Sequence, residues 1–192
     1  MPLLLASTSP HRKTLLERLA VPFTCVAPEV DEGLVSGEVP WDRALRLARA
    51  KALAVARSHP DSIVIGSDQV ASLGEGPELQ VLRKPGNRES CRLQLAALSG
   101  NTARFDTAVA VVHGAGLVDH LDLTRVRFRT LDAREIDDYM DREPSFDCAG
   151  GFKSEGLGAT LFEAIETSDP TALIGLPLVW LCVALGDIGV TV

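Results

Sequence analysis

The first stretch that could carry chemistry joins hydroxyl groups to positive charge at the expected start of a helix. It reads ASTSPHRKTLLERLA, residues 6–20, and it places Ser7 and Ser9 before Arg12 and Lys13. A helix N-terminus presents unpaired N–H groups and a partial positive charge, so these side chains could surround an anion. Ser9 followed by Pro10 is equally typical of an ordinary capped helix, and the stretch alone leaves both interpretations open.

Carboxylates gather in a second stretch, PEVDEG, residues 28–33, which contains Glu29, Asp31 and Glu32. Hard oxygen ligands of this kind suit Mg²⁺ or Mn²⁺, which often combine one or two protein carboxylates with the phosphates of a substrate. A merely solvated acidic loop has the same composition, so this pattern also leaves two interpretations.

A third candidate is Asp68, which directly follows the apolar run IVIGS at residues 63–67. We expect this run to be a buried strand that ends at Ser67 and Asp68. A carboxylate held at such a strand end could bind a metal or accept a proton from water. Capping of the next turn is the alternative role for an aspartate in this place.

Two lysines in glycine-containing loops form the fourth candidate. Lys84 lies in RKPGN, residues 83–87, and Lys153 lies in CAGGFKSEGLG, residues 148–158. Neither loop has the GxxxxGK[ST] spacing of a P-loop, but glycine lets the backbone approach a ligand closely. Glu155 would repel phosphate, so we expect it to face another part of the ligand, such as a base edge with N–H donors.

The elements that must position these side chains alternate between strands and helices, which predicts an α/β fold with a central sheet in one domain, residues 1–192. Gly100 is expected to follow a helix end. The predicted strands are 3–6, 23–26, 62–68, 102–114 and 117–131. One predicted helix begins at Pro10, and the others cover 41–58, 88–98, 132–142 and 176–185. Residues 74–87 are predicted to be a loop.

Charge and cysteine usage exclude several classes of function. The formal net charge of −7 and a pI near 5.1 argue against a nucleic-acid binder, which needs excess Lys and Arg. The four cysteines form no CxxC pair, so we expect reduced thiols in the cytoplasm. The N-terminal apolar run is too short for a signal peptide, and the apolar C-terminal stretch is shorter than the roughly 20 residues that span a bilayer. We therefore expect no membrane association.

Taken together, the motifs LASTSPHRKTLLERL, PEVDE, LARAKA, IGSDQV, RKP and CAGGFKSEGLG resemble the Maf family of nucleoside triphosphate pyrophosphatases. The resemblance extends over nearly the whole chain, and SDQV with GGFKSEG looks like the branch that hydrolyses 7-methyl-GTP. It implies a Maf/ITPase-like fold with a central mixed, twisted sheet, flanking helices and two lobes around a cleft. It also implies a divalent metal cofactor, Mg²⁺ or Mn²⁺, a nucleoside triphosphate substrate and a homodimer.

The resemblance further implies a role for each matching residue. Asp68 matches the proton acceptor that activates water for attack on the α-phosphorus, and together with Glu32 it would bind the metal. The positions that distinguish substrates match His11, Gln69 and Glu155. The phosphate-binding positions match Ser7, Ser9, Arg12, Lys13, Lys51, Lys84 and Lys153.

Two alternative functions stay open at this point. One is the branch of the same family that cleaves dTTP and UTP, which Gln69 and Glu155 disfavour. The other is a nucleotide-binding regulator of septum formation, for which a complete catalytic set would be unnecessary.

Overall fold

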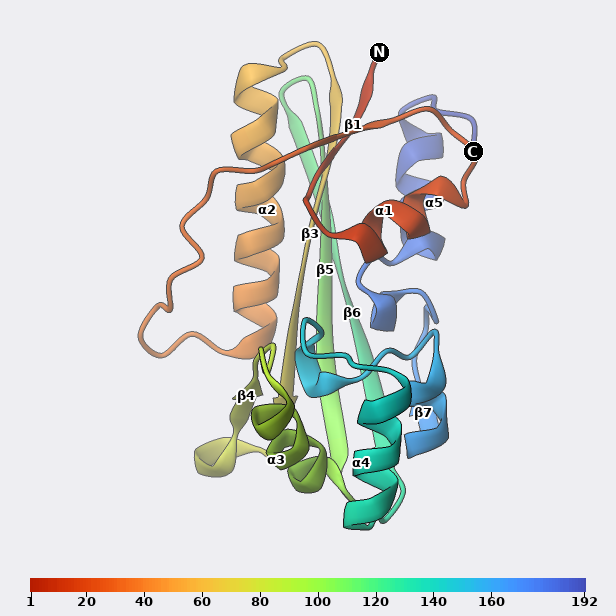
Figure 1. Ribbon diagram of the computed structural model, residues 1–192. Coiled ribbons are helices and arrows are strands. Elements are labelled where there is room, and N and C mark those ends of the chain that lie inside the picture. Colours follow the sequence, from red (N-terminus) through yellow and green to blue (C-terminus); the bar gives the residue numbers. More distant parts are fainter. The chain divides into compact units, whose positions relative to one another are not determined.

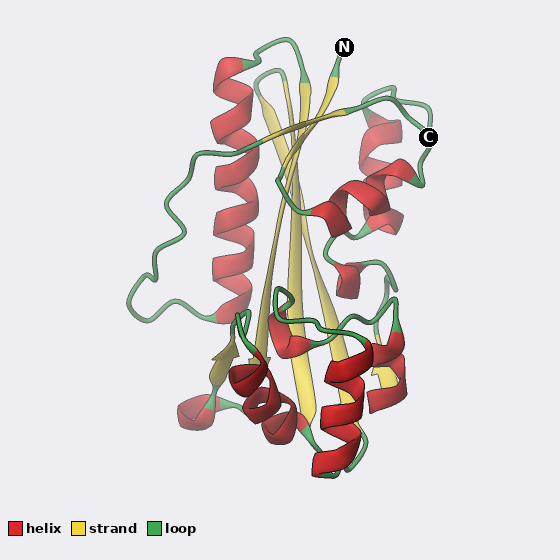
Figure 2. Ribbon diagram, viewed as in Figure 1, coloured by secondary structure: helices red, strands yellow, loops and turns green.

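The computed structural model describes residues 1–192, and its strands and helices alternate along the chain as predicted (Figures 1 and 2). The strands are β1 (Leu3–Ala6), β2 (Thr24–Val26), β3 (Ile63–Leu73), β4 (Gln80–Leu82), β5 (Thr102–His113), β6 (Gly116–Phe128) and β7 (Phe162–Glu166). The helices are α1 (Pro10–Glu17), α2 (Pro40–Ser58), α3 (Arg88–Leu98), α4 (Ala133–Arg142) and α5 (Leu178–Asp187). Four short 3₁₀ turns complete the list: η1 (Gly76–Glu78), η2 (Ala149–Gly151), η3 (Leu157–Leu161) and η4 (Ala172–Ile174).

The seven strands form one mixed sheet in the order β2-β1-β3-β5-β6-β7, with β4 paired to β3. β1 pairs in parallel with both β2 and β3, whereas the β3–β4 and β6–β7 pairs are antiparallel. The predicted α/β class with a central mixed sheet is therefore confirmed. No helix combines the length and the apolar character that crossing a membrane requires.

Contacts divide the chain into two compact units whose boundaries fall inside β3, β5 and β6. Unit 1 contains Met1–Gln69, Asp106–Asp122 and Ser168–Val192. Unit 2 contains Val70–Phe105 and Leu123–Thr167.

Unit 1 is built on the alternation of side chains along β1 and β3. Leu3 and Leu5 pack with Ile63 and Ile65 in a buried cluster that includes Leu15 of α1 and residues of α5, because alternate residues of a strand share one face. α2 covers the opposite face (Figure 1), and it lies so close that a Cβ on Gly66 would be 2.3 Å from the carbonyl oxygen of Ala48. The predicted C-terminal helix is confirmed by α5, which buries Leu178, Leu181, Ala184 and Leu185 and leaves Val179 and Val183 exposed.

Aromatic rings form the core of unit 2. Phe152 packs edge-to-face against Phe105, Phe128 and Phe162, with ring centroids 5.6, 5.4 and 5.0 Å away. Such geometry matches the electron-poor edge of one ring to the electron-rich face of the next.

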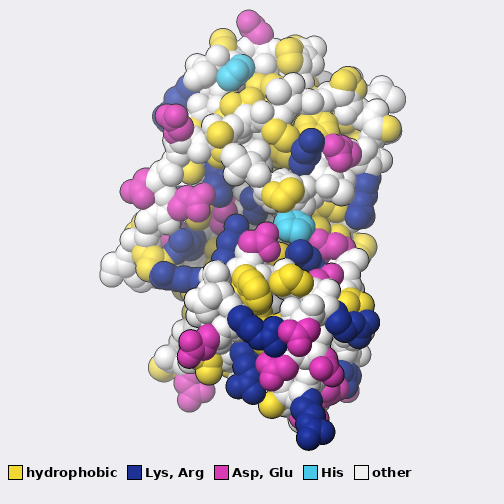
Figure 3. Space-filling model, viewed as in Figure 1, with side chains coloured by type: hydrophobic (Ala, Val, Ile, Leu, Met, Phe, Trp, Pro, Cys, Tyr) yellow, Lys and Arg dark blue, Asp and Glu magenta, His cyan; other side chains and the backbone are white.

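Ion pairs join the exposed sides of α3 and α4 in unit 2. Arg88 contacts Asp141 at 2.6 Å, and Arg92 contacts Asp137 at 3.1 Å. On the face drawn in Figure 3, basic and acidic side chains are interspersed over this region. Exposed pairs of this kind contribute little to stability, so we assign the main stabilisation of this unit to its aromatic core.

Two sequence-based predictions of local structure are wrong. β3 does not end at Ser67 and Asp68 but continues to Leu73. Val70 and Ala71 keep the strand buried after the polar triplet, which is Ser67, Asp68 and Gln69. The predicted loop 74–87 contains β4, which forms a hairpin with β3 in the register Ala71↔Leu82. Its glycines and prolines lie in the turns on either side of this short strand.

The helix boundaries agree closely with their sequence signals. Ser9 is the N-cap of α1 with Pro10 at the first helical position, and Asp132 forms a capping box with Glu135 at the start of α4. Gly100 follows the end of α3 with a φ of 70°, as predicted for a residue in this place.

One buried hydroxyl in β3 predicts a stabilising substitution. Ser72 is 1% exposed, and its Oγ has no hydrogen-bond partner in the protein. Because the hydroxyl is bonded to water in the unfolded chain and desolvated on folding, we expect Ser72→Ala to raise the free energy of unfolding by about 1 kcal/mol in a urea titration.

Ser145→Ala is the matched control for this substitution. Ser145 is also buried, but its hydroxyl lies 3.1 Å from the backbone oxygen of Glu143 and donates to it, so its removal should lower stability. A loss of stability in Ser72→Ala equal to that of the control would contradict the prediction.

Candidate functional site

A buried lysine of unit 1 holds two carboxylates together. Lys51 lies on the core-facing side of α2, and its Nζ contacts Oδ1 of Asp68 at 2.6 Å and Oε1 of Glu32 at 2.7 Å. The Lys51 side chain is 8% exposed, and a buried ammonium requires such partners. The three sequence-predicted residues therefore form one cluster, although they lie on a helix, a strand and a loop.

Positive and negative charge are matched in this cluster. Lys51 lowers the pKa of Glu32, mainly through the hydrogen bond from its ammonium group. Burial lowers the pKa of Arg12, and the negative charges of Asp68 and Glu32 oppose that effect. Two cations thus face two carboxylates, and an additional anion would need further positive charge.

The carboxylate donors suit a divalent cation. Asp68 and Glu32 both reach within hydrogen-bond distance of one ammonium group, so the two carboxylates lie close together, with Lys51 at the point where those oxygens meet. Mg²⁺ and Mn²⁺ prefer such oxygen ligands and commonly use one or two carboxylates with the phosphates of a substrate. The two neighbouring carboxylates are therefore donors of the type that suits the metal predicted from the sequence.

The other two acidic residues of the PEVDEG stretch lie elsewhere. Glu29 and Asp31 line a groove of about 500 Å³ beside α2, together with Arg46, Arg49 and Arg57. Asp31 also accepts a hydrogen bond of 2.8 Å from the backbone of Gly33, as in an ordinary turn. Only Glu32 of this stretch contacts Lys51.

The start of α1 combines helix capping with a capacity to bind an anion. The Oγ of Ser7 accepts a bond from the backbone of Ser9, and the Oγ of Ser9 accepts one from the backbone of Arg12, at 3.1 and 3.4 Å. A hydroxyl that accepts a hydrogen bond still has its own proton to donate. The two interpretations that the sequence left open are therefore compatible.

Lys13 and His11 have different surroundings on α1. The Lys13 side chain is 58% exposed, and its ammonium lies 3.7 Å from the carboxylate of Glu17, one helical turn away. His11 is half-buried at the start of the helix. Arg12, between them, interacts electrostatically with Asp68 and Glu32.

Ser67 and Gln69, the two neighbours of Asp68 in β3, are fixed by the turn η4 and the residue that follows it. Because successive residues of a strand point to opposite faces of the sheet, both lie on the face opposite to Asp68. The side-chain amide of Gln69 donates to the carbonyl oxygens of Ala172 and Leu173, at 3.0 Å each, and to Oγ1 of Thr107 at 2.9 Å. These bonds engage the donor nitrogen of Gln69, and a contact of its side chain with a ligand would then use Oε1.

Gly175 connects the same turn to two further side chains. Its carbonyl oxygen accepts from Nε of Arg12 at 3.0 Å and from Oγ of Ser67 at 2.9 Å. Its φ of 124° is one that residues with a side chain rarely adopt. The turn therefore holds Arg12, Ser67 and Gln69 through backbone oxygens alone.

Sequence reasoning missed Ser67, Thr107 and Gly175 as parts of the site. Thr107 is fully buried in β5, and its Oγ1 both receives the Gln69 amide and donates to Ala172. The available signal was Gly175 within the apolar stretch TALIGLP, residues 171–177, which interrupts an otherwise helical pattern. A glycine in such a place indicates unusual backbone geometry rather than a helix.

The remaining predicted residues belong to unit 2. Lys84 is exposed two residues after β4, and Lys153 is half-buried in the loop that follows η2. Glu155 is exposed and accepts a hydrogen bond of 3.4 Å from the hydroxyl of Ser154. All three lie on or beside glycine-containing loops, as predicted, and their roles stay predictions.

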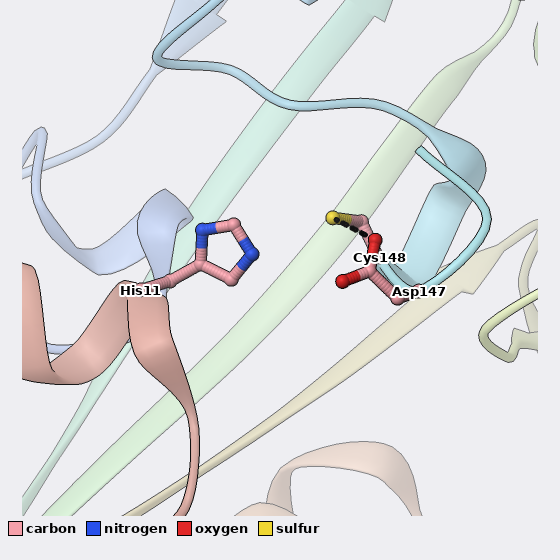
Figure 4. A group of neighbouring side chains, drawn as sticks. All are labelled: His11, Asp147 and Cys148. Carbon is pink, nitrogen blue, oxygen red and sulfur yellow. Dashed lines mark hydrogen bonds between the residues drawn. The ribbon is translucent and has the colours of Figure 1, made fainter. Parts of the chain in front are cut away.

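Cys148, at the start of the glycine-rich loop, is a poor candidate for a nucleophile. Its thiol donates to Oδ1 of Asp147 at 3.6 Å, as drawn in Figure 4. Burial first, and then the charge of Asp147, raise the pKa of this thiol to about 12. The thiolate is the reactive form of cysteine, so Cys148 is unreactive near neutral pH.

Comparison with known proteins gives matches over nearly the full chain. A family model described as Maf-like protein matches residues 2–188. A protein of Xanthomonas axonopodis pv. citri named 7-methyl-GTP pyrophosphatase is 52% identical over 187 residues, which cover 97% of this chain and 96% of that protein. Proteins of the same name from Alkalilimnicola ehrlichii and Bordetella parapertussis are 53% and 48% identical, covering 93% and 97% of this chain and 88% and 92% of their own lengths.

Among solved structures, the Ham1 protein of Staphylococcus aureus resembles this chain with a TM-score of 0.46 and 14% identity. The similarity covers 68% of this chain and 73% of that protein.

The backbone of Gly175 predicts the effect of a single added methyl group. In Gly175→Ala the φ of 124° becomes strained, so we expect the free energy of unfolding in urea to fall by about 1 to 3 kcal/mol. The carbonyl shift that relieves this strain should weaken the bond from Nε of Arg12, and the Nε–H signal of Arg12 should exchange faster with solvent in NMR.

Gly186→Ala is the control, because Gly186 lies in α5 and a Cβ there would meet nothing within 4 Å. We expect that variant to be as stable as the wild type or slightly more stable, since alanine favours a helix. Equal stability of both variants would show that the turn tolerates a side chain at position 175.

Proposed function

Because the chain belongs to the Maf family, we propose that it is a nucleoside triphosphate pyrophosphatase that hydrolyses 7-methyl-GTP to 7-methyl-GMP and pyrophosphate. Relatives of that name, about half identical over nearly the whole chain, support this substrate. The observation that carries the proposal is the convergence of Asp68 and Glu32 on Lys51, beside the charge of Arg12. In this proposal Asp68 is the general base, Asp68 and Glu32 are the metal ligands, and Lys51 and Arg12 are the two cations.

Asp68 is assigned the role of proton acceptor. Its Oδ1 is bonded to Lys51, which leaves Oδ2 as the oxygen that is not engaged by the ammonium. A water molecule gives its proton to this carboxylate as its oxygen forms a bond to the α-phosphorus. The bond from the α-phosphorus to the bridging oxygen then breaks, and pyrophosphate leaves with the electron pair.

Positive charge has to offset the negative charge that grows on the departing pyrophosphate. Arg12 and Lys51 supply two fixed cations in unit 1. Glu32 and Asp68 would hold a divalent cation, Mg²⁺ or Mn²⁺, which would supply further positive charge for the phosphates. We assign the remaining phosphate contacts to Ser7, Ser9, Lys13, Lys84 and Lys153, whose hydroxyl and ammonium groups suit phosphate oxygens.

Recognition of the base is assigned to Glu155, Gln69 and His11. Methylation at N7 gives the guanine ring a positive charge and makes its N1 proton more acidic. A carboxylate that accepts from the N1 and N2 donors therefore prefers this base to an uncharged one. His11 would stack on the ring, and Gln69 would contribute its amide oxygen.

The proposed enzyme acts in the cytoplasm. None of the four cysteines takes part in a disulfide, which suits a reducing compartment.

Measuring pyrophosphate release tests both the substrate and the role of Asp68 as general base. Purified protein with Mg²⁺ or Mn²⁺ should cleave 7-methyl-GTP in preference to GTP, UTP and dTTP, and EDTA should abolish the reaction. In Asp68→Asn we expect the turnover number to fall at least about 100-fold, since a positioned general base commonly contributes that much.

The matched control for this variant is Asp61→Asn, because Asp61 is exposed in the turn before β3. Circular dichroism should show the same fold for both variants. Turnover of Asp68→Asn at the wild-type rate would remove Asp68 from the mechanism. A preference for UTP or dTTP would assign the chain to the other substrate branch.

A second prediction concerns Glu155. In Glu155→Gln the negative charge that favours the methylated base is lost, so kcat/KM for 7-methyl-GTP should fall about 10-fold, as expected for a charge-assisted hydrogen bond, while that for UTP changes little. Glu163→Gln serves as the control, since Glu163 pairs with Arg127 at the surface of unit 2. Equal losses for both substrates would argue against base recognition by Glu155.

A further inference from the structure

Two side chains at the end of α4 hold the loop that carries Lys153 and Glu155. The phenolic oxygen of Tyr139 accepts a hydrogen bond of 3.1 Å from the backbone N–H of Lys153. The carboxylate of Glu143 accepts one of 3.2 Å from the backbone N–H of Gly158. The two bonds fix the first and last residues of the segment Lys153–Gly158, and Glu155 lies between them.

Tyr139 and Glu143 also contact each other and are buried to different degrees. The hydroxyl of Tyr139 donates to Oε2 of Glu143 at 3.2 Å and lies 3.0 Å from the hydroxyl of Ser145. Tyr139 is 4% exposed and Ser145 is fully buried, whereas Glu143 is half-buried. Burial raises the pKa of Tyr139 well above its ordinary value, so its hydroxyl keeps the proton that it donates.

The Lys153–Gly158 loop packs closely against the carboxylate of Glu143. A Cβ at Gly156 would overlap Oε1 of Glu143, so a larger residue fits there only if the Glu143 side chain moves. The backbone N–H groups of Gly156 and Gly158 both donate to the carbonyl oxygen of Lys153, at 3.2 and 3.1 Å. The loop is therefore held by hydrogen bonds within its own backbone and by the carboxylate of Glu143 at the end of α4.

Glu143 is not explained by the stability of α4 itself. It is the C-cap of that helix, where the partial negative charge of the helix end disfavours a carboxylate. The exposed side of α4 has its own ion pairs through Asp137 and Asp141. What the Glu143 carboxylate does contact is the loop and the tyrosine that anchors it.

We propose that Tyr139 and Glu143 are positioning residues that hold the Lys153–Gly158 loop in one conformation and thereby set the preference for a methylated, cationic base. The inference rests on the proposed function, because Glu155 in that loop is the residue assigned to the base. Neither side chain needs to touch the substrate. Their effect passes through the backbone at Lys153 and Gly158.

The test compares kcat/KM for 7-methyl-GTP and for GTP in single and double variants. Tyr139→Phe removes one hydroxyl, and Glu143→Ala removes the carboxylate. In each we expect the ratio of the two kcat/KM values to fall about 3- to 10-fold, the effect of one lost hydrogen bond, mainly through a higher KM for 7-methyl-GTP. Glu143→Gln keeps one oxygen acceptor and should lose less than Glu143→Ala.

The double variants separate positioning from general destabilisation. If Tyr139 acts through Glu155, then Tyr139→Phe should change the ratio little in a Glu155→Gln background. Losses that multiply in the double variant, or an unchanged ratio in Tyr139→Phe, would overturn the proposal. Asp137→Asn, on the exposed side of α4, is the control and should keep the wild-type ratio.

Melting temperatures identify any variant that loses its fold. If Glu143→Ala is unfolded at the assay temperature, Tyr139→Phe decides alone, since the phenyl ring still fills the buried site. A wild type without preference for 7-methyl-GTP overturns the proposed function and this inference with it. A wild type whose preference is lost in Glu155→Gln but kept in Tyr139→Phe and Glu143→Gln overturns only the positioning role.

Discussion

The charge of one buried ammonium group determines how the candidate site of unit 1 is built. Lys51 lies on the apolar side of α2, where an unpaired charge would be very unfavourable, so Asp68 and Glu32 have to reach it. Asp68 can do so because α2 packs directly on β3, with only hydrogen at Gly66 between the two backbones. Helix, strand and acidic loop are thus held together by one ammonium group.

The side chains of the polar triplet in β3 point in different directions because successive residues of a strand face opposite sides of the sheet. Asp68 points toward α2, while Ser67 and Gln69 point toward η4 on the other face. Had the strand ended at Asp68, the three side chains would not be distributed in this way. Its continuation through Val70 and Ala71 therefore fixes the direction of the carboxylate as well as its position.

Much of this arrangement could be predicted from the sequence, because its signals are local. Ser9 and Pro10 mark the start of α1, and the apolar periodicity of residues 41–58 predicts α2. The chemistry of Asp68 and Glu32 was also visible as residue types. The family resemblance assigned Lys51 to the phosphate-binding positions, but it did not indicate that Lys51 joins the two carboxylates, and no short-range pattern connects residues 32, 51 and 68. The roles of Thr107 and Gly175 depend on contacts between residues that lie 38 to 163 positions apart in the chain, and no sequence pattern indicated these contacts.

The turn η4 holds its three partners through main-chain oxygens, which every amino acid possesses. Exchange of Ala172 or Leu173 for another apolar residue leaves those acceptors in place, whereas the geometry at Gly175 depends on the missing side chain. The acceptors thus restrict the residue types of this segment less than its packing does, since Ala172 and Leu176 are fully buried. Among distant relatives, its spacing from the polar triplet and its single glycine should persist longer than the identity of the residues between them.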